Sequence, residues 1–121
     1  MKKLLACALA LLSLAACAGN RDDAQADKIT RAVINNDMSP VMNDLDPAIK
    51  GQITRVRVAE LSDELNDQGK LLSIKETQQN CKPGWHCFDV KFQKRNYVEH
   101  MQMDDQNKVV NWYFRPADAS T

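Results

Sequence analysis

The fold is decided by Phe88–Pro116, FDVKFQKRNYVEHMQMDDQNKVVNWYFRP. Apolar side chains recur at every second position in this stretch, beginning with Phe88 and Val90, and polar side chains stand between them. Such alternation is typical of strands that bury one face and expose the other. Polar clusters at 94–96 and 104–107 divide the stretch into three strands joined by short turns. We therefore expect consecutive antiparallel strands.

The same alternation predicts which side chains share a face. In the first two strands the mainly apolar set is Phe88, Val90, Phe92, Tyr97, Glu99, Met101 and Met103. In the last strand it is Val110, Trp112 and Phe114. Val109, Tyr113 and His100 are expected on the opposite side of their strands. Leu72 and Ile74 alternate with polar residues in the same way and predict one more strand at the start of the sheet.

Before Gly69 the apolar period is that of helices. One face of the first predicted helix carries Ala26, Ile29 and Val33, and one face of the last carries Val58, Leu61 and Leu65. Ser39 is expected to cap a short helix that starts at Pro40, and Thr54 to cap the last one, although alternation over 53–58 leaves a strand open there. Helices followed by a meander of strands predict an α+β fold, with two to three N-terminal helices packed on a bent antiparallel sheet of about four strands.

The strand pattern carries a family resemblance. Its elements are Phe88-Asp-Val-Lys-Phe92, Glu99, Met103-Asp104, Lys108-Val109-Val110 and Trp112-Tyr-Phe-Arg-Pro116. Together they resemble the C-terminal half of small bacterial nuclear transport factor 2-like domains, and the resemblance covers roughly residues 24–118. It implies helices packed into a bent sheet that forms a cystatin-like cone with an open mouth. Because such domains serve as enzymes, ligand binders and interaction modules, the resemblance does not decide the function.

The first 17 residues predict export. Lys2 and Lys3 form a basic start, and an apolar run too short to span a bilayer follows them, as in a signal peptide over 1–16. Leu14-Ala15-Ala16-Cys17 resembles the lipobox of bacterial lipoproteins, in which the cysteine becomes the lipid-bearing N-terminus. Ala18 after it implies the outer membrane, on the periplasmic side. The alternative is ordinary signal cleavage that leaves Cys17 a thiol. Residues 17–26 are expected to be the lipidated cysteine and a tether, and 27–118 the domain.

The two cysteines of the domain predict one disulfide. Cys81 and Cys87 flank a Pro-Gly turn, and paired cysteines in an exported protein usually form a bond. A metal site would use these cysteines with His86 and His100. The local spacing Cys-x4-His-Cys fits no closed zinc pattern, so we expect no metal.

Catalytic motifs do not stand out in the sequence. It has no Gly-x-Ser-x-Gly, no His-Glu-x-x-His and no glycine-rich phosphate loop. An isomerase-like site would use Asp89 or Glu99 as base and Tyr97 or Tyr113 as oxyanion donor. We expect instead that the protein has no catalytic residues and no cofactor.

Protein binding is the expected function. Trp85 lies in the disulfide-closed turn, where it either folds back on the core or meets a partner, and aromatic side chains dominate binding hot spots. His86, Tyr97 and Tyr113 are the further candidates for this surface. With 16 basic and 16 acidic residues, the chain is unlike a nucleic-acid binder. The expected partners are the membrane, through the lipid, and either an effector that an immunity protein would neutralise or an envelope protein. The alternatives are a carrier or sensor of an apolar ligand in the cone, or an envelope or secretion-complex subunit.

Overall fold

The computed structural model describes residues 20–118, and for residues 20–22 the backbone only. The predicted signal peptide, the lipobox with Cys17 and the first tether residues lie outside the described residues. The helical elements are α2 (Asn20–Ile34), the 3-10 helix η1 (Ser39–Asp44), α3 (Pro47–Lys50) and α4 (Arg55–Asn66). The strands are β1 (Leu71–Thr77), β2 (His86–Phe92), β3 (Asn96–Met103) and β4 (Val109–Pro116). The predicted α+β order is confirmed.

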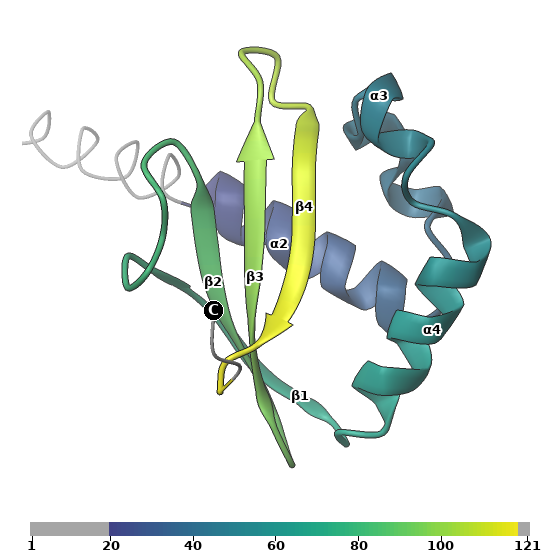
Figure 1. Cartoon of the computed structure of the whole chain (residues 1–121), viewed down its shortest axis with the longest axis vertical. Coiled ribbons are helices and arrows are strands. Elements are labelled where there is room, and N and C mark those ends of the chain that lie inside the picture. The colour runs from purple at the N-terminus through teal and green to yellow at the C-terminus, as the bar shows by residue number, and fades with distance from the viewer. Residues whose placement is uncertain (1–19, 119–121) are drawn as a thin grey trace, which may run out of the picture.

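The four strands form one antiparallel sheet in the order β1-β2-β3-β4. Figure 1 shows α2 lying across the back of this sheet, with α4 and α3 beside β4. One core cluster joins the helices to the sheet, because Ile29 of α2 and Leu65 of α4 are buried together with Phe88 and Val90 of β2. Burying this apolar area is the main source of stability for a domain of this size.

The first helix begins earlier than the sequence indicates. α2 starts at Asn20, so 20–26 are helical rather than part of a tether over 17–26. Ala26 is fully buried in the core, and Gln25 donates a hydrogen bond of 3.4 Å to Asp44. These tertiary contacts stabilise the first turns of α2, whose polar composition alone does not predict a helix.

The helix caps are confirmed at one position and wrong at another. The Thr54 hydroxyl accepts a hydrogen bond of 3.2 Å from the backbone N–H of Arg57 and caps α4 as predicted. Ser39 does not cap η1, since Met38 holds the cap position. The side chain and backbone N–H of Ser39 instead bond to the Asp37 carboxylate, which lies before the helix.

Two β-bulges change the predicted faces. Leu71 pairs with Phe92 while Ser73 pairs with the preceding residue of β2, so the register shifts at Leu72. Leu71 packs against the core and Leu72 is 62% exposed, the reverse of the prediction. A second shift beside Met103 turns Val109 into the core, where it is fully buried. An extra residue in one strand moves every side chain beyond it to the other face.

Candidate functional site: the outer face of the sheet

We call the side of the sheet that is turned away from the helices the outer face. Strand register defines it by two rows of side chains, Cys87 beside His100 beside Tyr113, and Asp89 beside Val98 beside Arg115. The residues that alternate with these belong to the core. The outer face is directed toward the viewer in Figure 1, where none of the labelled helices covers it.

Three rings meet on the outer face, and we call them the aromatic cluster: Trp85, His100 and Tyr113. The rings of His100 and Tyr113 stack with 4.3 Å between centroids and 10° between planes. Trp85 meets Tyr113 edge-on at 5.7 Å. The guanidinium of Arg115 lies 5.5 Å from the Tyr113 centroid, within the range of a cation–π contact. All three rings are half-buried, so part of each surface stays open to solvent.

The disulfide loop, residues 81–87, brings Trp85 to this cluster. Cys81 and Cys87 form the predicted disulfide, with 5.8 Å between their Cα atoms. Inside the loop the backbone N–H of Trp85 donates a hydrogen bond of 3.0 Å to the carbonyl of Lys82. The Cys87 sulfur also lies 3.4 Å from Nδ1 of His100. The covalent bond and these contacts hold the loop against β3 and β4 with little freedom left to lose on binding.

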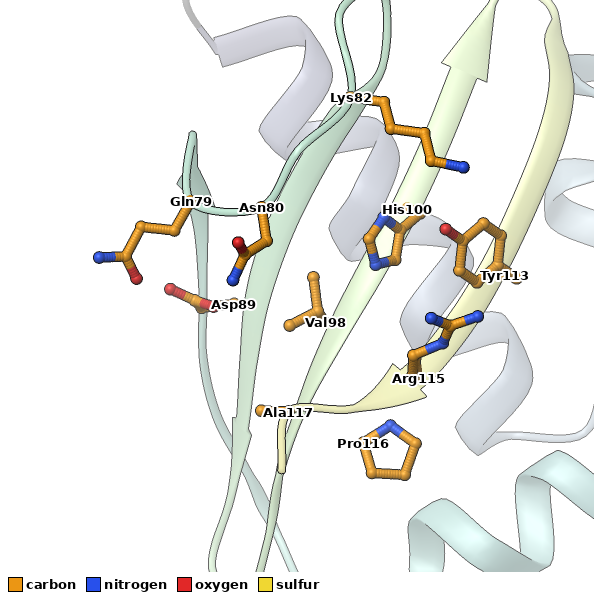
Figure 2. A pocket seen from close by; sticks show the side chains of 10 residues that line it. All are labelled: Gln79, Asn80, Lys82, Asp89, Val98, His100, Tyr113, Arg115, Pro116 and Ala117. Carbon is orange, nitrogen blue, oxygen red and sulfur yellow. The ribbon is translucent and has the colours of Figure 1, made fainter. Parts of the chain in front are cut away.

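A pocket of about 390 Å³ opens between this loop region and the strands. Its lining is Gln79, Asn80, Lys82, Asp89, Val98, His100, Tyr113, Arg115, Pro116 and Ala117. Figure 2 shows Lys82 and Arg115 approaching the His100–Tyr113 stack from opposite sides, whereas Asp89 lies across Val98 from them. The pocket therefore has a basic, aromatic end and an end with one carboxylate and two amides.

His100 is the titratable group at the basic end. Burial lowers the pKa of its imidazole, and the positive charges of Arg115 and Lys82 lower it further. The ring is therefore mainly neutral at neutral pH. A bound anion would reverse the electrostatic part of this shift.

The predicted binding residues separate into two groups. Trp85 and Tyr113 come together on the outer face as predicted. His86 lies instead on the helix side of the sheet edge, where Nδ1 is 3.7 Å from the Glu76 carboxylate. Tyr97 is fully buried and packs edge-on against Phe92 and Phe114. Tyr97 is therefore a core residue and does not extend the surface.

The two carboxylates considered for catalysis lie in different environments. Glu99 is fully buried on the helix side, where Oε1 accepts a hydrogen bond of 3.1 Å from Thr30 and Oε2 accepts one of 2.6 Å from Trp112. Burial raises the pKa of Glu99 to about 8 despite these donors. Asp89 does share the outer pocket with Tyr113, but β3 separates their strands, which places the two backbones about 10 Å apart.

Lys82, Arg115 and Asn80 were not predicted from the sequence as site residues. Alternation along β4 could have found Arg115, because it shares a face with Tyr113. Lys82 and Asn80 reach the pocket only because the connection between β1 and β2 folds over the outer face. No sequence pattern predicts that this connection covers part of the outer face.

Two hollows on the helix side bear on the predicted cone. A hollow of about 220 Å³ lies there between α3, α4 and β4, lined in part by Ile53, Leu61 and Trp112. A second hollow of about 540 Å³, lined in part by Leu65, lies between α2, α4 and the first two strands, and it exceeds the size of about 300 Å³ at which ligand pockets generally start. Within residues 20–118, no cluster of three or more metal-binding side chains is found, and no helix is long and apolar enough to cross a bilayer.

Comparison of the chain with protein-family models, curated proteins and solved structures finds no match. The resemblances to nuclear transport factor 2-like domains and to lipoproteins therefore stay predictions. The function has to be inferred from the chemistry of the outer face.

Proposed function

We propose that this protein is a periplasmic lipoprotein, anchored in the outer membrane through Cys17, that binds a partner protein without catalysing a reaction. The partner would dock on the outer face of the sheet. The lipobox-like sequence supports the anchor in this proposal. The chemistry of the outer face supports the binding role.

The aromatic cluster is the observation that carries the proposal. Trp85 and Tyr113 are half-exposed, are held by a disulfide loop and a strand, and lie beside exposed cations. Tryptophan, tyrosine and arginine are the side chains most enriched in binding hot spots. A rigid loop loses little conformational entropy when a partner binds, so its aromatic contacts count more fully toward affinity.

The position of α2 suits an anchored binding module. Asn20, its first residue, is three positions after Cys17, a span of about 10 Å at most. α2 crosses the helix side of the sheet, so the outer face is turned away from the element nearest the anchor (Figure 1). A lipidated chain of this design would hold the domain near the membrane and leave the outer face open to periplasmic proteins.

An immunity role fits this proposal best among protein-binding roles. Such a protein neutralises an effector delivered into the periplasm and needs one tight, specific surface rather than catalytic groups. The described site offers a rigid aromatic cluster and a basic pocket, which are features of a binding surface.

Affinity capture from gently solubilised cells tests the proposal. The full tagged chain should retain one stoichiometric protein, and Trp85→Ala together with Tyr113→Ala should release it. Val56→Ala is the matched control, because Val56 is 67% exposed on α4 and distant from the outer face. Retention of the same protein by the double variant would contradict docking on the outer face.

A further inference from the structure

The charges on the outer face are unbalanced, although the whole chain has 16 basic and 16 acidic residues. Strand register places Lys75, Lys91 and Arg115 on this face, and Lys82 adds a fourth cation from the disulfide loop. Asp89 is the one carboxylate in the outward rows of the four described strands, and its cross-strand partner is Lys75. Lys75 therefore neighbours the one carboxylate, and the other cations of the outer face are Lys91 on β2, Arg115 on β4 and Lys82 on the loop.

The two cations of the pocket form no ion pair with an acidic side chain in the part of the chain that the structure describes. Arg115 and Lys82 are both exposed, and neither takes part in an ion pair among the described residues. The guanidinium of Arg115 lies 5.5 Å from the Tyr113 ring centroid, a contact that favours one direction of this side chain. Arginine in a fixed orientation suits a carboxylate, because its planar N–H groups match the two carboxylate oxygens.

Three of the side chains that line the pocket, Lys82, His100 and Arg115, carry a basic nitrogen. Lys82 and Arg115 reach toward the His100–Tyr113 stack from opposite sides (Figure 2), and all four side chains line the pocket. A carboxylate in the pocket would be attracted by both cations. The half-buried surroundings would also strengthen the attraction relative to bulk water.

We propose that this pocket receives a carboxylate side chain from an acidic segment of the partner protein, bound between Arg115 and Lys82 against the His100–Tyr113 stack. The segment's origin in a partner rests on the proposed function, whereas the carboxylate chemistry rests on the pocket alone. Charge complementarity selects this occupant, since a basic segment would meet the two cations of the pocket, and the one carboxylate there, Asp89, already neighbours Lys75.

Titration with a defined acidic peptide tests the pocket without knowledge of the partner. The full chain in neutral maltoside detergent is titrated with acetyl-hexaglutamate amide, and with acetyl-hexalysine amide as the control, while NMR resonances are followed. The acidic peptide should shift the resonances of His100, Tyr113 and Arg115, and hexalysine should not. Arg115→Gln and Lys82→Gln should each weaken binding about fivefold, and Arg57→Gln, an equal charge change on α4, should leave it unchanged.

The pKa of His100 provides a readout that non-specific binding of the peptide would not change. The groups that face His100 are Lys82 on the loop, Tyr113 and Arg115 on β4, and Asp89 across Val98. A carboxylate bound among them stabilises the imidazolium, so saturating hexaglutamate should raise the pKa of His100. An unchanged pKa, or equal binding by Arg115→Gln, would overturn the proposal.

Two further outcomes separate the possible failures. If inorganic phosphate shifts the same resonances at lower concentration than hexaglutamate, the pocket is a phosphate site and the carboxylate proposal is wrong. In another outcome, the captured partner is lost in the Trp85→Ala, Tyr113→Ala double variant but retained by Arg115→Gln and Lys82→Gln. That result would support docking on the outer face and overturn the proposal that an acidic segment enters the pocket. If hexaglutamate binds as expected but no protein is captured, the pocket does bind carboxylates and the proposed protein-binding function is wrong.

Discussion

Replacing Glu99 by glutamine should make the protein more stable at neutral pH. The Glu99 carboxyl is fully buried, and its pKa rises from 4.5 to about 8 on folding. In the unfolded chain the carboxyl loses its proton near pH 4.5, whereas in the folded protein it keeps the proton until about pH 8. Between these values the folded state binds more protons, so the free energy of unfolding falls as the pH rises.

The size of the effect follows from the two pKa values. Each pH unit inside the window lowers the free energy of unfolding by about 1.4 kcal/mol. The contribution of Glu99 is fully present below pH 4.5, and about 4 kcal/mol of it is lost by pH 7.5. Glutamine carries no charge and keeps an oxygen that can accept from Thr30 or Trp112. The variant should therefore escape this loss.

Urea unfolding, followed by tryptophan fluorescence at pH 5, 6, 7 and 8, measures the effect. The quantity to compare is the free energy of unfolding of Glu99→Gln minus that of the wild type, since His100 and other titrating groups cancel in the difference. This difference should grow with pH by about 1.4 kcal/mol per unit. A difference that stays constant from pH 5 to pH 8 would refute the buried, protonated carboxyl.

Further predictions concern the anchor, the disulfide, the aromatic cluster and one turn. Cys17→Ser should release the protein from the membrane fraction, and a variant that stays in that fraction would refute lipidation. Cys81→Ser should lower the free energy of unfolding by about 2.4 kcal/mol for a seven-residue loop, measured by urea unfolding with and without reductant. Trp85→Ala should cost only about 1 kcal/mol of stability, since its ring contact is at the surface, and a loss of several kcal/mol would make it a core residue. Gly69→Ala should destabilise by more than 1 kcal/mol, because φ is +86° and the new Cβ would lie 2.5 Å from a side-chain oxygen; Gly51→Ala, with open space and helical φ, is the control.

Alternation predicted most of the sheet because strand side chains change face with every residue. Phe88 and Val90 in β2, and Tyr97 and Met101 in β3, all lie in the core as their spacing indicates. The prediction failed at the two bulges, since an inserted residue has no signature in composition. It also failed at the start of α2, because the helix begins at Asn20 in a polar segment that shows no apolar period.

The candidate site was predictable only in part, because it depends on contacts between distant residues. The aromatic content of the disulfide loop pointed to Trp85, yet its meeting with Tyr113 depends on the loop folding over β3 and β4. Glu99 looked like a possible base, since nothing in its neighbourhood shows that Thr30, 69 positions away, donates to it in the core. Local sequence patterns predict which side chains share a face of a strand or helix. Tertiary packing decides which of the polar residues among them are buried.

Site-specific photo-crosslinking in living cells tests the central claim most directly. Benzoylphenylalanine at Gln79, an exposed residue at the edge of the outer pocket, is compared with the same group at Val56 on α4. Docking on the outer face predicts that one protein is crosslinked from position 79 and not from position 56. Absence of an adduct at position 79, or the same adducts from both positions, would contradict the account.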